Sequence, residues 1–225
     1  TRGEMAKMIC VILNGGKDPV LGETITNSYT DTVGHWAAGY IEYCTQLGIV
    51  AGDGAGNFNP NATVTGSEAA KMLLVALGYN AQYENMIGAN WAVATNVLAN
   101  KNGLYDGLTL DVSAGLTRDN AAQMIYNALD AGVVSYEYTL ITDGSSLSSS
   151  PTLIDNNSKT LLEDAFNAVK VEGVVVANEY ANLESSAAKG AALDAGETKL
   201  IVTNDEDQKV FGDGKYSVST SLDML

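Results

Sequence analysis

The chain has 225 residues, of which 46% are hydrophobic, and a formal net charge of −15. This length allows one large domain or two small ones, each with a buried core. The negative charge argues against nucleic acid or an anionic membrane surface as partner, because both would require a basic face. No apolar run is long enough to cross a bilayer, so we expect no membrane insertion.

A helix start recurs three times in the first 130 residues. The strings TRGE, TGSE and TRDN begin at Thr1, Thr65 and Thr117, and each precedes a short apolar run, MAKMICVIL, AAKMLLVAL or AAQMIYNAL. A Thr followed three residues later by Glu, as with Glu4 and Glu68, predicts a capping box at the beginning of a helix. In the third copy Asn replaces the Glu. Each string therefore predicts a helix whose apolar stripe belongs to the core.

A second recurring element begins with tryptophan. Trp36 and Trp91 each start a segment with helical spacing, and Gly48 and Gly103 follow where a left-handed helix C-cap belongs. Because each Trp begins an apolar stripe, we predict that both are buried, although such rings could instead stack on sugar faces. The repeating unit is thus a Trp helix, a glycine turn, a loop and a capped helix.

After Asp130 the pattern changes from helical to extended. Residues 133–141 are rich in β-branched and aromatic side chains, residues 151–154 could form a returning strand, and residues 159–168 have helical spacing. The later segments KVEGVVVANEY, TKLIVTN and GKYSVST also predict strands. We therefore expect an α-helical repeat region followed by a smaller β-rich or α+β domain.

Residues that carry chemistry are scarce. Cys10 and Cys44 both fall on apolar helix faces and read first as buried hydrophobic side chains, with a disulfide as the alternative. The single histidine, His35, has neither a nucleophile nor a metal-ligand spacing beside it. We predict no metal site, no cofactor and no enzyme activity.

Residues 1 to about 130 resemble the S-layer homology modules of bacterial cell-surface proteins. The resemblance rests on the aromatic-x-Asp of Tyr29 and Asp31, GHW at 34–36, GIVAGDGAGNFNP at 48–60, and the three helix-start strings. It implies three modules folded together in a pseudo-threefold set, with the Trp-bearing helices in a central bundle. The implied divisions are 1–14 (the C-terminal half of a first module), 29–80, 81–130, and a β-rich or α+β domain at 131–225 that we expect to continue further.

The resemblance implies a location outside the cell, in the cell wall and S-layer of a bacterium. The implied function is non-covalent anchoring of a surface-layer protein. The implied partner is secondary cell wall polysaccharide, often carrying a pyruvate ketal, bound in grooves between neighbouring modules, and self-association in a surface lattice is a second expected partnership. The alternative is the anchor region of a cell-surface polysaccharide hydrolase whose catalytic domain lies outside this chain.

The positions of the two arginines indicate the chemical class of the expected ligand. Arg2 and Arg118 are the only arginines in the chain, and each follows a capping Thr, where a cation is mildly unfavourable against the helix dipole. A guanidinium matches a carboxylate with two parallel donors, and a helix N-terminus offers amides, so we predict a seat for the carboxylate of a pyruvylated sugar. A salt bridge to Asp119 or Glu4 is the alternative. Gly66 replaces the Arg in the second copy, so we expect a weak groove there. The predicted ligand-binding residues are Thr1, Arg2, Glu4, Trp36, Thr65, Gly66, Glu68, Trp91, Thr117, Arg118 and Asp119.

Overall fold

The computed structural model describes residues 1–22, 27–142, 147–183, 193–202 and 214–217. The chain forms two compact units, Thr1–Ala168 and Val169–Leu225. The described residues form a mixed α+β structure with six α-helices and two small antiparallel sheets. The elements in chain order are α1 (Arg2–Leu13), a 3-10 helix (Thr30–Thr32), α2 (Ala38–Gln46), α3 (Gly66–Ala76), α4 (Trp91–Lys101), α5 (Arg118–Asp130), β1 (Gly132–Thr142), β2 (Leu147–Thr160), α6 (Leu161–Phe166), β3 (Gly173–Asn178), β4 (Glu197–Val202) and β5 (Gly214–Ser217).

The capped helices start as predicted. Full capping boxes open α1 and α3, and at the start of α5 the Thr117 hydroxyl accepts a hydrogen bond from the amide of Asn120. Each such cap stabilises its helix by about 1 kcal/mol. A further capping box, Thr160 with Glu163, opens α6 and was not singled out from the sequence.

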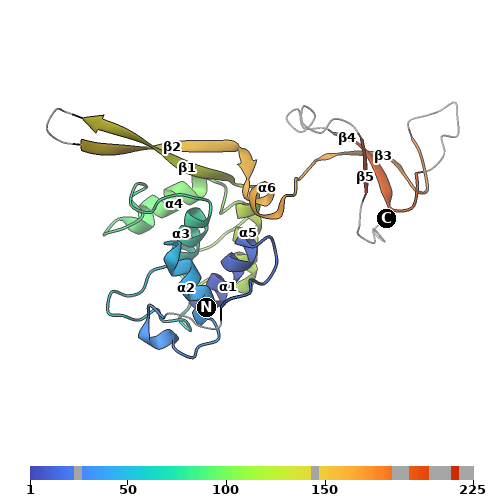
Figure 1. Ribbon diagram of the computed structural model, residues 1–225. Coiled ribbons are helices and arrows are strands. Elements are labelled where there is room, and N and C mark those ends of the chain that lie inside the picture. The colour runs from blue at the N-terminus through green and yellow to red at the C-terminus, as the bar shows by residue number, and fades with distance from the viewer. Residues whose placement is uncertain (23–26, 143–146, 184–192, 203–213, 218–225) are drawn as a thin grey trace. The chain divides into compact units, whose positions relative to one another are not determined.

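The capped helices also link the repeats, contrary to the expected bundle of Trp helices. In Figure 1, α1 lies beside α2, and α3 lies beside α4. Helix α3 additionally contacts α1 and α5, whereas α2 and α4 each pack mainly on one capped helix. The reason is the distribution of buried residues, since six residues of α1 and seven of α3 are buried, while α4 buries only Thr95 and Ala99.

Tryptophan burial is a second correction. Trp36 is 56% exposed and Trp91 is only half-buried, so the prediction that both are core residues is wrong. Helix α2 begins two residues after Trp36, and the small Ala37 and Ala38 occupy the buried side at this point. The tryptophans are therefore open to the grooves described below.

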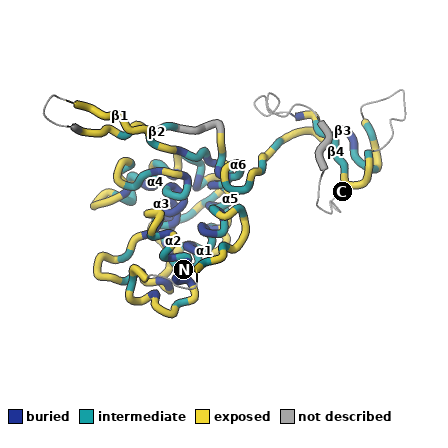
Figure 2. The backbone as a smooth tube through the Cα atoms, viewed as in Figure 1, coloured by how far each residue is buried: buried dark blue, intermediate teal, exposed yellow. Residues whose placement is uncertain are grey.

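A long hairpin and a short helix complete the first unit. Strands β1 and β2 pair antiparallel, and Figure 2 shows that the part of β1 farthest from the helices is exposed. At the base of the hairpin, the amide of Val134 donates to the carbonyl of Leu77 at 2.8 Å. Gly78 has φ of 104°, and any side chain there would collide with the Val134 carbonyl. The hairpin is thus attached to the helical repeats.

The attachment of α6 explains where the first unit ends. Leu161 is 1% exposed, and its amide donates to the carbonyl of Ala131 at 3.0 Å. Burying such a side chain is worth about 2 kcal/mol. The compact unit consequently runs to Ala168 and includes residues after the change of pattern at Asp130.

The second unit contains the three predicted strands in the order β3-β4-β5, all antiparallel. Ala177 and Val202 are buried, whereas Val174, Val175 and Ile201 are exposed. The end of the predicted strand GKYSVST lies outside the described residues.

Among the described residues, no helix combines the length and apolar character needed to cross a bilayer. In the same part of the chain, no cluster of three or more His, Cys, Asp or Glu side chains is arranged to hold a metal ion.

Candidate ligand grooves

Two surface grooves border α1. The first, the α1–α5 groove, has a volume of about 640 Å³, and its lining includes Glu4, Lys7, Met8, Trp36 and Arg118. The second, the α1–α3 groove, has a volume of about 770 Å³, and the matching part of its lining is Glu68, Lys71, Met72, Trp91 and Arg2, together with the loop Gly48–Asp53.

The two grooves use equivalent positions of the repeat. In each, one copy provides the Arg, another copy provides the Glu, Lys and Met of a capped helix, and a Trp completes the wall. The sequence predicted the Arg, Glu and Trp residues but missed Lys7 and Lys71. Their signal was present, because AKM follows the Glu at the same spacing in the first two copies, while the third copy has AQM. Of the predicted site residues, Thr65, Gly66 and Asp119 line neither groove.

The guanidinium of Arg2 is bound by the 48–60 loop and by Glu68. Its Nε donates to the carbonyl of Phe58 at 3.0 Å, its second terminal nitrogen donates to the carbonyl of Ala51 at 2.9 Å, and its first pairs with Glu68 at 3.3 Å. The guanidinium also lies 4.5 Å from the centre of the Phe58 ring, and the side chain is only 17% exposed. Arg2 therefore fixes the 48–60 loop as the floor of the α1–α3 groove.

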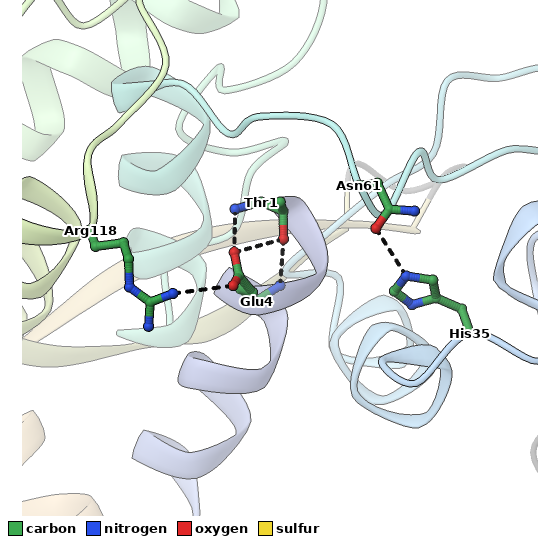
Figure 3. Close-up of polar contacts among 5 residues, drawn as sticks. All are labelled: Thr1, Glu4, His35, Asn61 and Arg118. Carbon is green, nitrogen blue, oxygen red and sulfur yellow. Dashed lines mark hydrogen bonds and ion pairs between the residues drawn. The ribbon is translucent and has the colours of Figure 1, made fainter.

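Arg118 is, in contrast, almost fully exposed. Its side chain is 94% accessible, and among the described residues its one ion pair is with Glu4, at 3.3 Å (Figure 3). The sequence-based alternative of a salt bridge to Glu4 is thus present, and the pair with Asp119 is not. Because a single exposed ion pair contributes little to stability, this guanidinium can turn toward a ligand at small cost.

The capping glutamates have two roles. In both Glu4 and Glu68, Oε2 accepts the capping-box bond from the backbone nitrogen of the N-cap Thr, while Oε1 accepts from the Arg of another copy. The same residue thus begins its own helix and joins it to a neighbouring repeat. Each Glu of the repeat therefore has an Arg partner from another copy, Arg118 for Glu4 and Arg2 for Glu68.

At the third equivalent position, both partners are replaced. Gly66 stands in the place of the Arg, and Asn120 stands in the place of the Glu. A Cβ at Gly66 would lie 2.9 Å from both a methyl carbon of Leu110 and the Cα of Val112. The chain before α5 therefore fills the space that an Arg side chain would need.

Backbone amides at two helix starts are already used. The amides of Arg2 and Gly3 donate to the carbonyls of Ala62 and Pro60, both at 2.9 Å. The equivalent amides at the start of α3, those of residues 66 and 67, donate in the same way to carbonyls of the segment before α5. The prediction that these amides are available to an anion is therefore wrong for α1 and α3.

The two lysines differ in their surroundings. Lys7 pairs with Asp18 at 2.7 Å, and this hydrogen bond raises the pKa of Lys7 and lowers that of Asp18. Asp18 also accepts a hydrogen bond from Tyr40 at 2.7 Å. Lys71 is half-buried, with its Nζ 5.7 Å from the centre of the Trp91 ring, and burial lowers its pKa. Within the described part of the chain, no carboxylate lies at salt-bridge distance from Lys71.

Two further residues of the repeated motif, Asp31 and His35, form hydrogen bonds near the 48–60 loop. Asp31 accepts hydrogen bonds from the amides of Phe58 at 2.8 Å and Asn59 at 2.6 Å, and Phe58 is 1% exposed. His35 accepts from the amide of Ala37 through Nδ1 and lies 3.2 Å from the Asn61 oxygen through Nε2 (Figure 3). These hydrogen bonds stabilise the 48–60 loop and the start of α2.

Comparison with known proteins relates the chain to bacterial surface proteins. The S-layer homology domain family matches residues 28–70. The chain is 30% identical over 135 residues to an uncharacterised cell wall amidase of Bacillus anthracis, covering 55% of this chain and 24% of that protein. It is 28% identical over 170 residues to a cell surface protein of Thermoanaerobacter kivui, covering 76% of this chain and 19% of that protein.

A third relative is the surface-layer 125 kDa protein of Lysinibacillus sphaericus, which is 28% identical over 122 residues, or 50% of this chain and 10% of that protein. The chain thus spans a quarter or less of the length of these relatives. The matches support a location in the bacterial cell wall and surface layer. Residues 28–70 thus match the S-layer homology domain family, and the chain is similar over longer stretches to bacterial cell-surface and surface-layer proteins.

Proposed function

We propose that the helical unit anchors a surface protein to the bacterial cell wall by binding secondary cell wall polysaccharide in the α1–α5 and α1–α3 grooves. The observation that carries the proposal is that equivalent residues of different repeats converge on both grooves, each combining a tryptophan, a lysine and an Arg–Glu pair. An aromatic ring beside a cation suits a sugar with an acidic substituent.

A pyruvyl carboxylate is the substituent that we assign to these grooves. In the α1–α5 groove its partner is Arg118, which is exposed and held by one ion pair. In the α1–α3 groove its partner is Lys71, since Arg2 already uses its donors on the loop. The two grooves would therefore bind the same group with different cations.

The repeats are proposed to form a pseudo-threefold set made of residues 1–14, 29–80 and 81–130. The third equivalent position, with Gly66 and Asn120, lacks both members of the ion pair, so we expect it to bind weakly. A chain of net charge −15 is repelled on average by an anionic polymer. Use of two grooves together, and contacts between copies in a surface lattice, would provide avidity.

The relationship to a cell wall amidase favours a second candidate, in which these repeats anchor a hydrolase. In both candidates the role of this chain itself is to bind wall polysaccharide. The only histidine bonds Ala37 and Asn61 and has no nucleophile beside it in the described structure. Sequencing of the complete gene separates the candidates, because a hydrolase would continue into a catalytic domain.

The two tryptophans provide the test, because the chain has one in each groove. A ¹⁵N-labelled chain is titrated with oligosaccharides prepared from wall polymer, and the two indole N–H resonances are followed by NMR. We expect both resonances to shift with the pyruvylated fragment and neither to shift after the pyruvyl groups are removed. Equal shifts with both fragments would contradict the carboxylate assignment, and no shift with either would contradict polysaccharide binding.

A further inference from the structure

Two buried thiols meet where α1 packs on α2. The Sγ atoms of Cys10 and Cys44 are 3.5 Å apart, and the side chains are 1% and 0% exposed. Each thiol also faces a carbonyl of the opposite helix, that of Tyr40 for Cys10 and that of Ala6 for Cys44, both at 3.6 Å. These are the only cysteines in the chain, so neither has another possible partner within it.

The other repeat shows that packing alone does not require sulfur here. Leu74 follows Thr65 by the same nine residues that separate Cys10 from Thr1, and Ala99 follows Trp91 by the same eight that separate Cys44 from Trp36. Leu74 and Ala99 are both fully buried where α3 packs on α4. An apolar pair therefore fills this contact in one repeat, and the two cysteines replace both members together in the other.

We propose that Cys10 and Cys44 are oxidised to a disulfide that cross-links α1 to α2. The sulfur atoms need to approach from 3.5 Å to about 2.05 Å, the length of an S–S bond. Helix α1 carries Lys7 and Met8, and Trp36 lies two residues before the start of α2, so the bond ties together two walls of the α1–α5 groove. A location at the cell surface, outside the reducing cytosol, favours such a bond.

The reaction is thiol–disulfide exchange with a small-molecule disulfide, such as oxidised glutathione. The hydrogen bond from Cys44 lowers the pKa of the Cys10 thiol, and the same bond with burial raises that of Cys44. The Cys10 thiolate attacks one sulfur of the reagent and expels a thiolate, and Cys44 then attacks the Cys10 sulfur and expels the second. The two thiol protons pass to the two expelled thiolates, so one disulfide is reduced and one is formed.

Burial determines when this reaction takes place. Because both sulfur atoms are shielded in the folded chain, the reagent reaches them while α1 and α2 are still assembling. The bond then closes a loop of 34 residues and restricts the unfolded chain. For a chain of this size we expect the oxidised form to melt roughly 10 °C above the reduced form.

The experiment refolds the 225-residue chain with a mixture of reduced and oxidised glutathione. The expected result is an intact mass about 2 Da below that of the reduced chain, no maleimide-reactive thiol in denaturant, and a Tm that falls when a reductant is added. Two thiols that remain reactive in denaturant, or a Tm that does not respond to reductant, would overturn the proposal.

The matched control is the double variant Cys10→Leu with Cys44→Ala, which copies the pair found between α3 and α4. It is expected to fold and to show a Tm that is independent of reductant. If this variant and the wild-type chain respond equally to reductant, the effect does not come from a Cys10–Cys44 bond and the proposal fails.

Discussion

The α1–α5 and α1–α3 grooves contain the same residue types at equivalent positions, yet a different cation is accessible in each. In the first, Arg118 is exposed while Lys7 is paired with Asp18. In the second, Lys71 has no acidic partner in the described structure while Arg2 is held by three acceptors. Neighbouring groups, more than residue type, decide which cation can meet a ligand.

One residue outside the repeated motif accounts for part of the difference. Asp18 lies in the segment that follows α1, and it accepts hydrogen bonds from both Lys7 and Tyr40. The loop after α3 provides no equivalent carboxylate near Lys71. A half-buried ammonium without a counter-ion is unfavourable in the free protein, and an incoming carboxylate would relieve that cost.

The largest expected effect extends the comparison to the third equivalent position. Gly66→Arg should lower the free energy of unfolding by about 2–3 kcal/mol, because its side chain would overlap Leu110 and Val112. Urea denaturation measures this loss. The control is Gly22→Arg, where nothing lies within 4 Å, and its effect should stay within about 0.5 kcal/mol. A stable Gly66→Arg chain would show that this position is as open as the other two.

Next in size is the contrast between the two arginines. Arg2→Ala should lower the free energy of unfolding by about 2 kcal/mol, because it removes part-buried hydrogen bonds and leaves Glu68 without its cation. Arg118→Ala should cost less than about 0.5 kcal/mol, since its single ion pair is exposed. Urea denaturation of both variants makes the comparison, and equal losses would contradict the distinction between a structural and an accessible arginine.

The third prediction concerns binding by the lysines. Lys71→Met should weaken the response of the Trp91 indole to pyruvylated oligosaccharide about tenfold and leave that of Trp36 unchanged, because it removes one charge-assisted contact. The matched variant Lys7→Met should change the Trp36 response less than threefold, since Asp18 already neutralises that lysine. NMR titration measures both, and equal effects would contradict the assigned difference.

The smallest expected effect is on stability without ligand. Lys71→Met should raise the Tm by about one or two degrees, because burial lowers the pKa of Lys71 and its charge therefore disfavours the fold. This cost is complete below the folded-state pKa and fades as the pH rises toward the unfolded value near 10.4. The difference in Tm between variant and wild type should shrink over that range. Scanning calorimetry checks it, and a lower Tm for the variant at neutral pH would oppose the assignment.

Local chemistry explains what the sequence predicted correctly. The Thr and Glu of a capping box act within one turn, and Gly48 and Gly103 adopt the left-handed conformation within one residue, with φ of 72° and 69°. Enrichment in β-branched and aromatic residues likewise located strands after Asp130. Each of these signals lies within a few adjacent residues.

Long-range packing accounts for what the sequence did not predict. Trp36 is exposed because Ala37 and Ala38 occupy the buried side at the start of α2, and the inward position of Arg2 depends on carbonyls about fifty residues away. Lys7 and Lys71 were not singled out from the sequence, and the structure places them in grooves that also contain Trp36 and Trp91. The roles of these residues arise between repeats, where spacing along one repeat carries no information.

The hydrogen bonds at the helix starts have a practical consequence for transplanting these repeats. The first amides of α1 are satisfied by the loop at Pro60 and Ala62, and those of α3 by the segment that carries Val112. A single copy cut out of the chain would leave two donors unpaired at its own helix and two acceptors unused on its loop. An engineered cell-surface tag should therefore carry the complete set, because the copies are interlocked rather than interchangeable parts.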